Sequence, residues 1–148
     1  MITVKDLLDK KGYDYWYVKP KSTVFEALQK MAEKDVGALM VIDNSKLAGM
    51  FSERDYARKI ILHGISSKQA VVSDYMTKII VTVKPQTSIN DCMALMTEKR
   101  VRHLPVLDHN EIQGIVSIGD IVNAIIHQQN ITIKDLENYI TGSGYGTE

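Results

Sequence analysis

The chain has little of the chemistry that most readily reveals a function. Cys92 is the one cysteine in 148 residues, so the sequence contains no partner for an internal disulfide, which fits a reducing compartment. It lies within a helical pattern, and we expect a buried structural thiol rather than a nucleophile. Eighteen basic residues balance eighteen acidic residues, so no net charge would hold the chain on nucleic acid or on an anionic membrane. Any anionic ligand must therefore be met by local groups.

Targeting and membrane-spanning patterns are also missing from the sequence. Residues 1–10 carry charges throughout and lack the apolar core of a signal peptide. The longest apolar stretches, such as residues 124–126, are far too short to cross a bilayer. We expect a cytoplasmic protein with no membrane partner.

Motifs that carry catalysis are lacking too. There is no Cys-x-x-Cys, no His-Glu-x-x-His and no phosphate loop of the Gly-Lys-Ser type, and the histidines are scattered without ligand spacing. The glycine-rich residues 142–146 follow no strand and precede no helix, so they indicate a flexible tail rather than a dinucleotide loop. The sequence predicts that the protein is not an enzyme and has no catalytic or metal-binding residues.

What the sequence does contain is an internal repeat. Lys19-Pro20 recurs as Lys84-Pro85, and the same spacing of 65 residues continues without a gap through both copies. Matching pairs at this spacing include Met31 and Met96, Val36 and Val101, Leu39 and Leu104, Val41 and Val106, Asp43 and Asp108, Gly49 and Gly114, Ser52 and Ser117, and Asp55 and Asp120. The repeat divides the chain into one unit over 1–65, a second over 66–130, and a C-terminal helix and flexible tail over 131–148.

Each unit has the pattern of a β-α-β-β-α motif. The predicted strands are 15–18, 38–42 and 47–51 in the first unit, and 79–83, 103–107 and 112–116 in the second. Helices are predicted after the N-cap residues Thr23 and Ser88, over 53–62 and 118–128, and outside the repeat over 4–10 and 132–140. Because so small a unit buries little surface alone, we expect both to pack face to face as one α/β (α+β) module with pseudo-two-fold symmetry.

Two spaced motifs in each unit resemble the cystathionine-β-synthase (CBS) domain. They are Val101–Val106 and Gly114–Ile121 in the second unit, and Val36–Val41 and Gly49–Asp55 in the first. The resemblance implies a CBS pair of the small stand-alone bacterial or archaeal kind, with AMP, ADP, ATP, NAD(H) or S-adenosylmethionine in clefts between the repeats. It also implies a homodimer that signals to a separate, unknown effector protein.

The same resemblance gives roles to the Ser-x-x-Asp sequence at the start of each second helix. Ser52 and Ser117 would hold ribose or phosphate, and Asp55 and Asp120 would accept hydrogen bonds from the ribose hydroxyls. Physical chemistry agrees, because a helix start offers unpaired N–H groups and a carboxylate accepts from both hydroxyls of a cis-diol. The alternative is a capping box, in which Ser and Asp only cap the helix.

The other predicted ligand residues differ between the copies. Arg54 offers a guanidinium for phosphate, or is simply solvated on its helix, whereas Ile118 offers apolar surface. In the family, basic residues near the cleft contact phosphate, which implies that role for Arg102 and His103, with a surface pair as the alternative. The predicted site also includes Pro105 of the same motif and, as apolar cover for adenine or else plain core strand, Tyr17, Val18, Val81, Thr82 and Val83.

Three functions remain open at this point. The first is a regulatory sensor that binds adenine nucleotide in two unlike clefts, with NAD(H) or AMP ranked ahead of S-adenosylmethionine. The second is a ligand-free dimerisation module, which need not keep Ser and Asp in both copies. The third is an S-adenosylmethionine-binding or RNA-associated CBS protein, although the neutral charge argues against nucleic acid.

Overall fold

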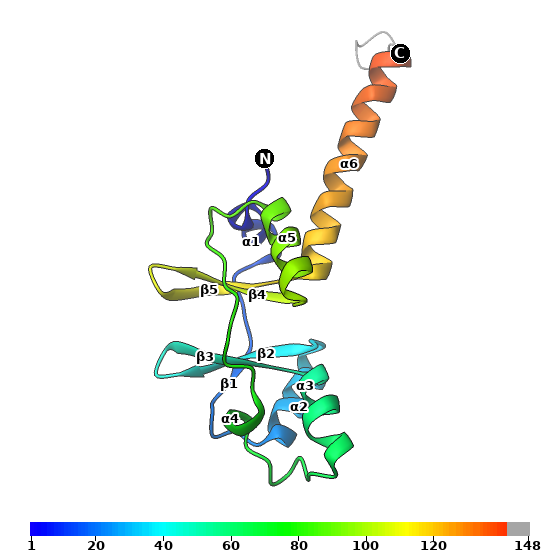
Figure 1. Ribbon diagram of the computed structural model, residues 1–148. Helices are drawn as coiled ribbons and strands as arrows, with labels where there is room; N and C mark the ends of the chain where they lie inside the picture. The colour runs from blue at the N-terminus through cyan, green and yellow to red at the C-terminus, as the bar shows by residue number, and fades with distance from the viewer. Residues whose placement is uncertain (142–148) are drawn as a thin grey trace.

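The computed structural model describes residues 1–141 as two stacked β-α units (Figure 1). In the first, strands β2 (Ala38–Asp43) and β3 (Lys46–Ser52) form a hairpin, and β1 (Tyr17–Val18) pairs in parallel with β2. In the second, β4 (His103–Asp108) and β5 (Glu111–Ser117) form the equivalent hairpin. Figure 1 shows the hairpins one above the other, with their turns on the same side of the molecule. The predicted α/β class and face-to-face arrangement of repeats are confirmed.

Both hairpins turn through residues with positive φ. Asn44 and Ser45 have φ of 50° and 67°, and His109 and Asn110 have φ of 51° and 65°. Two-residue hairpin turns that match the strand twist need positive φ at both positions, which asparagine tolerates better than most residues. These turns join the two central strands that the sequence predicts in each copy.

The helices α2 (Val24–Lys34) and α5 (Ile89–Lys99) also begin where the caps predict. Thr23 and Glu26 form a complete capping box, and the side chain of Ser88 accepts from the backbone N–H of Asp91. Each capping bond satisfies an N–H that the helix itself leaves unpaired. These helices cover the outer faces of the two hairpins (Figure 1).

The helix that precedes each unit packs on the other unit. Helix α1 (Val4–Lys11) buries Val4 and Leu8 in the core of the second unit, and its first N–H groups donate to carbonyls of the 85–87 segment. Helix α4 (Val72–Tyr75) buries Val72 in the core of the first unit. Each core is therefore completed by a helix from the opposite half of the chain.

Several predicted boundaries differ from the structure. The segment 79–83 is not a strand, because only Val83 bridges to β4, and the predicted 15–18 strand is reduced to β1. Helix α3 (Glu53–Lys59) ends early and is followed by the short 3-10 helix η1 (Ile61–His63). The two predicted helices after residue 118 form one helix, α6 (Ile118–Thr141), because no glycine or proline interrupts that stretch after Gly119.

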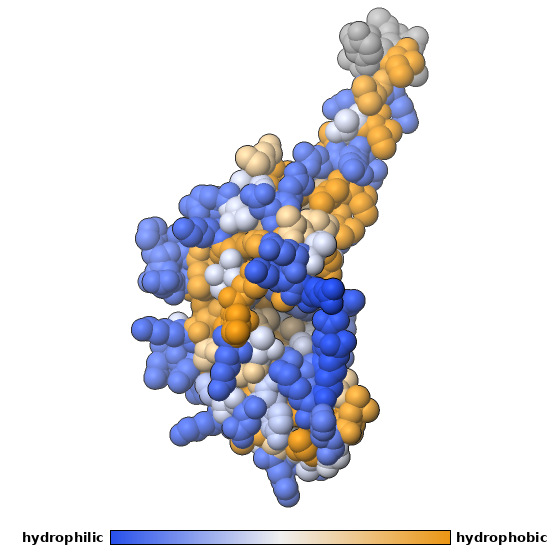
Figure 2. Space-filling model, in the orientation of Figure 1, coloured by the Kyte–Doolittle hydropathy of each residue, from blue (hydrophilic) through white to orange (hydrophobic). Residues whose placement is uncertain are grey.

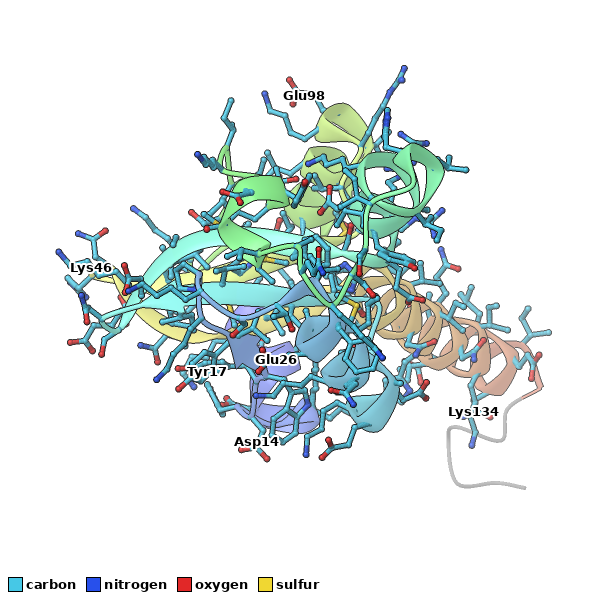
Figure 3. The ribbon with its side chains drawn as sticks, turned by 90° about the horizontal axis from the view of Figure 1, so that it is seen from below. Asp14, Tyr17, Glu26, Lys46, Glu98 and Lys134 are labelled. Carbon is cyan, nitrogen blue, oxygen red and sulfur yellow. The ribbon has the colours of Figure 1, made fainter. Side chains whose placement is uncertain are left out.

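Helix α6 leaves the body of the protein on the side away from the hairpin turns. Figure 3 shows Lys46, at the β2–β3 turn, and Lys134, on α6, at opposite sides of the molecule. No helix among residues 1–141 is both long and apolar enough to cross a membrane. The predicted glycine-rich tail lies almost wholly outside the described residues.

Candidate functional site

A cavity of about 420 Å³ opens between the two units, next to the start of α3. Its walls come from the start of β2, the end of β3, the segment that replaces the predicted 79–83 strand, and the segment leading into β4. The lining residues are Gly37, Ala38, Met50, Ser52, Glu53, Arg54, Asp55, Thr77, Ile79, Ile80, Val81, Arg100, Val101, Arg102 and His103. Three of them are arginines and two, Glu53 and Asp55, are carboxylates, so the cavity carries a small excess of positive charge in a neutral chain.

Ser52 and Asp55 form a complete capping box at the edge of this cavity. Asp55 N–H donates to Ser52 Oγ at 3.1 Å, and Ser52 N–H donates to Asp55 Oδ2 at 3.0 Å. The second carboxylate oxygen, Oδ1, accepts from the hydroxyl of Thr77 at 3.3 Å and lies 3.0 Å from Lys59 Nζ. The capping role that the sequence left open is confirmed, and the ribose-binding role stays a prediction.

The equivalent pair at the start of α6 has an additional partner. Ser117 and Asp120 form the same two capping hydrogen bonds, of 2.8 and 3.1 Å. Lys11, at the end of α1, places its Nζ 2.7 Å from Asp120 Oδ2 and 2.8 Å from the carbonyl oxygen of Ile115. Although partial burial opposes it, hydrogen bonds from Lys11 and from the Ser117 backbone hold the pKa of Asp120 below its ordinary value. The Lys11 ammonium and the Asp120 carboxylate therefore each have a further hydrogen-bond partner within the chain besides one another.

Six predicted ligand residues come together in the cavity, and the others do not line it. Those that line it are Ser52, Arg54, Asp55, Val81, Arg102 and His103. Ser117, Ile118 and Asp120 lie at the start of α6, and Thr82 is exposed. Val18 and Pro105 are buried strand residues, and Val83 is buried at its single bridge to β4. Val83 N–H donates to the Pro105 carbonyl at 3.0 Å, so these two residues hold the backbone of the second unit together.

The basic residues of the cavity differ in charge state. Burial, together with the positive charges of Lys11 and Arg102, lowers the pKa of His103, against the opposing charge of Asp120. His103 is therefore neutral at pH 7, while Arg54 and Arg102 are exposed and always charged. Positive charge for a phosphate would come from the arginines and not from the histidine.

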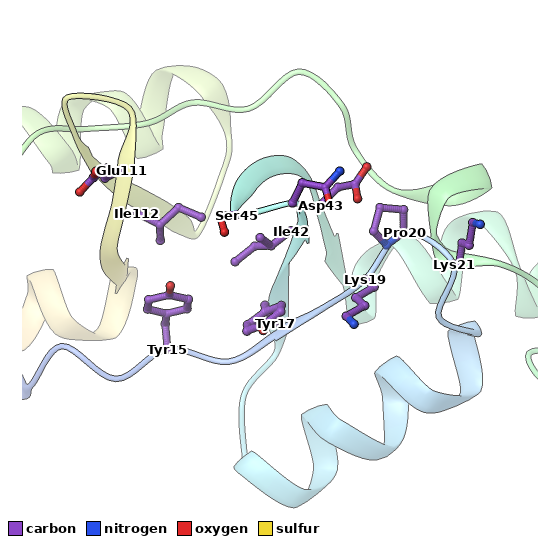
Figure 4. A pocket seen from close by; sticks show the side chains of 11 residues that line it. Tyr15, Tyr17, Lys19, Pro20, Lys21, Ile42, Asp43, Ser45, Glu111 and Ile112 are labelled. Atoms are coloured by element: carbon purple, nitrogen blue, oxygen red, sulfur yellow. The ribbon is translucent and has the colours of Figure 1, made fainter.

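Tyr17 lines a different and wider pocket of about 760 Å³ at the hairpin turns. Figure 4 shows Tyr15, Tyr17 and Ile112 facing this space, with Lys19 and Lys21 at its rim. This pocket lies at the end of the strands opposite to the helix starts, so it shares no lining residue with the 420 Å³ cavity.

Sequence reasoning missed three residues that touch the predicted carboxylates. One of them, Lys59, lies four residues after Asp55 on α3, a spacing that could have pointed to it. Thr77, just after α4, reaches Asp55, and Lys11, at the end of α1, reaches Asp120. Nothing local in the sequence links Thr77 and Lys11 to these aspartates, because they come close only through the packing of α1 and α4 on the opposite units. Ile79 and Ile80, which also line the cavity, could have been predicted as site residues, because they directly precede the predicted Val81.

Residues 1–141 meet neither the requirements of a metal site nor those of a reactive thiol. No cluster of three histidine, cysteine or acidic side chains lies there in a position to hold a metal ion. Burial, with a smaller contribution from Asp91, raises the pKa of the Cys92 thiol to about 11. The prediction of a buried structural thiol is confirmed.

Several known proteins are similar to this chain in sequence and in architecture. The plant protein CBSX3, a mitochondrial CBS domain-containing protein of Arabidopsis thaliana, is 40% identical over 97% of this chain and 73% of its own length. The structure of a protein with CBS domains from Burkholderia ambifaria has a TM-score of 0.82 and 45% identity, over 86% of this chain and 96% of that one. The structure of CBSX2 in complex with AMP has a TM-score of 0.69 and 31% identity, over 87% and 99%.

The model of the CBS domain matches twice, over residues 4–62 and 72–127, and so takes in both repeats with their preceding helices. This match covers most of the chain, and the stacked hairpins with Ser-x-x-Asp at the helix starts agree with it. The chain therefore belongs to the CBS domain family and carries two copies of that domain.

Proposed function

We propose that the chain is a regulatory module that binds an adenine nucleotide in the cavity between its repeats and acts on a separate protein without catalysing a reaction. The observation that carries the proposal is the meeting of Ser52, Asp55 and three arginines in one cavity. Its volume of about 420 Å³ falls within the range of small-molecule sites. The related protein CBSX2 has been seen in complex with AMP.

The ribose would lie against Asp55. Its carboxylate already accepts hydrogen bonds on both oxygens, and the bond from Thr77, at 3.3 Å, is the longest of them. A ribose hydroxyl donates in the same way and would replace the hydroxyl of Thr77, while the capping bonds from Ser52 stay intact. Binding would then keep the start of α3 in place and release Thr77.

The phosphate and the base would lie on either side of the ribose. Arg54, Arg100 and Arg102 supply fixed positive charge for phosphate, opposed in the lining by the two carboxylates of Glu53 and Asp55. The apolar residues 79–81 supply a surface for adenine. This arrangement favours AMP or NAD(H) over S-adenosylmethionine, because a sulfonium cation would meet the arginines with charge of the same sign.

The two predicted clefts would be unequal. Lys11 pairs with Asp120 as Lys59 pairs with Asp55, so the ion pairs do not separate the two sites. What separates them is the 420 Å³ cavity, whose lining includes Asp55 but not Asp120. We infer that the cavity beside Asp55 is the tighter site. An effector protein, in the cytoplasm or in whichever compartment holds the chain, would detect its occupancy.

Calorimetry with AMP, ADP, ATP, NAD, NADH and S-adenosylmethionine tests the proposal. At least one phosphate-bearing ligand should bind more tightly than about 1 mM, and Asp55→Ala should weaken it at least about tenfold. Thr23→Ala is the matched control, because it breaks the same kind of capping box at α2, whose residues do not line the cavity. Failure of all six ligands, or equal affinity in Asp55→Ala, would reject the nucleotide site.

A ligand-free dimerisation module is the second candidate. The observation in its favour is that capping alone accounts for Ser and Asp in both copies. It predicts no heat with any nucleotide and the same fall in stability, about 1 kcal/mol, for the two N-cap variants Ser52→Ala and Thr23→Ala.

A further inference from the structure

Helix α6 extends far beyond the core that anchors it. Its first turn packs on the second unit through the fully buried Ile121. From Ile126 to Glu137 every residue is exposed, and Figure 1 shows this part of the helix standing clear of the body. Isolated helices of this length are marginal in water, and the isoleucines, asparagines and threonine here are weaker helix formers than alanine. The exposed half of α6 therefore calls for a packing partner.

The exposed apolar residues of α6 follow a heptad, with Ile131 as the exception. Ile126, Ile133 and Ile140 occupy successive a positions, and the d positions hold Val122, Gln129 and Leu136. The isoleucines are 48%, 52% and 81% exposed, and Leu136 is 58% exposed. Figure 2 shows apolar side chains along this protruding helix. We call these six residues the α6 seam. At 1.5 Å per residue the seam is roughly 28 Å long.

The composition of the α6 seam fits a second copy of itself. β-Branched residues at a with leucine at d favour two parallel strands, and the α6 seam has isoleucine at all three a positions and leucine at one of its three d positions. In a parallel pair Gln129, the one polar residue of the seam, meets its own counterpart, and the two amides can hydrogen-bond to each other. At the flanking e and g positions Asn123, Asn130 and Thr132 are neutral, and Glu137 at e faces Thr132 at g of the second copy, so these positions bring no two like charges together.

Other occupants fit less well. A helix that lies on an anionic membrane has a polar face rich in lysine and arginine. In the exposed part of α6, Lys134 is the one such residue, and Asp135 and Glu137 outnumber it. A strongly charged protein partner would likewise find no complementary field.

We propose that two copies of this chain pair through parallel α6 helices along the α6 seam. The pairing sets the two CBS modules side by side at the same end of a short coiled coil. It uses none of the residues that line the cavity, so it stands independently of the nucleotide proposal.

Sedimentation equilibrium of the full chain and two matched variants tests the pairing. The unchanged protein should be a dimer at micromolar concentration, and Ile133→Lys should raise the dimer dissociation constant at least about 100-fold, because it buries two like charges in the seam. Ile131→Lys is the control, since Ile131 is 50% exposed on the opposite face of the same helix. That variant should dimerise as the unchanged protein does.

Cross-linking then tests the direction of the helices. Ile140→Cys, at the end of the seam, should form a disulfide-linked dimer under mild oxidation, since the equivalent ends of the seam meet only in a parallel pair, while Ile131→Cys should not. The native Cys92 is buried and does not interfere. A monomer at all concentrations, a dimer unchanged by Ile133→Lys, or a monomer that binds anionic vesicles through α6 would each overturn the proposal.

Discussion

The same substitution at two repeat-equivalent glycines should have different effects. Gly49 lies on β3 and Gly114 on β5, each beside the segment that follows an exchanged helix. A Cβ at Gly49 would lie 2.9 Å from the carbonyl oxygen of Thr77 and 2.6 Å from Met76 Sδ. A Cβ at Gly114 would meet a methyl group of Leu8 at 3.2 Å.

The difference between these neighbours sets the expected magnitude. Thr77 is held by two backbone hydrogen bonds to Met50, of 2.8 and 2.9 Å, so its carbonyl cannot move without breaking that bridge. Overpacking against fixed atoms typically costs about 1–3 kcal/mol, and reduced freedom of the unfolded chain returns about 0.4–1 kcal/mol. Gly49→Ala should therefore destabilise by about 1–2 kcal/mol. Gly114→Ala should stay within about 1 kcal/mol of the unchanged protein, because the flexible Leu8 side chain needs to move by only a few tenths of an ångström to make room for the new methyl group.

Urea unfolding followed by circular dichroism measures both variants. The midpoint should fall clearly for Gly49→Ala, with the slope unchanged. Thr77 also lines the cavity, so its displacement changes the cavity wall, and nucleotide affinity should change in Gly49→Ala and stay constant in Gly114→Ala. If both variants lose the same stability, or if Gly114→Ala loses more, then the Thr77 backbone is not the rigid neighbour of Gly49 that this prediction requires.

Two further predictions concern titratable groups. Because the pKa of Asp120 is lowered on folding, the stability from its contacts is present above its unfolded pKa of about 3.9 and is lost as pH falls through the lower folded value. Lys11→Met should flatten that acid limb of a stability–pH profile, and an unchanged profile would show that the ion pair contributes nothing. Cys92, with a pKa of about 11, should react with a thiol reagent at pH 8 only after urea unfolds the protein. Fast labelling of the folded chain would contradict its burial.

Local chemistry was enough to predict most of the repeat. Thr23 and Ser88 carry the cap signals of α2 and α5, and the apolar runs that begin at Ala38 and His103 form strands because both faces of the hairpin are covered. The prediction of a strand over 79–83 was wrong for the opposite reason. A strand needs a neighbouring strand to receive its hydrogen bonds, and β-branched residues alone do not supply one.

The candidate site was predictable only where its residues are neighbours in sequence. Ser52, Arg54 and Asp55 follow from one motif at a helix start, and the repeat points to Arg102 and His103. Contacts made by Lys11 and Thr77 depend on which unit each preceding helix joins. Spacing within a motif does not encode that choice, since either pairing would bury the same apolar residues of α1 and α4.

The exchange of α1 and α4 also bears on how the chain acquires its structure. Most of the first core, from β1 to α4, comes from one continuous stretch, and α4 docks soon after the segments it covers. Helix α1 precedes both units, yet its carbonyl partner Thr87 and the rest of its core are made much later. During synthesis α1 must therefore wait, without these contacts, until the second unit has been made. Contacts so distant in sequence slow folding, so we infer that docking of α1 is a late step and that the second CBS domain forms after the first.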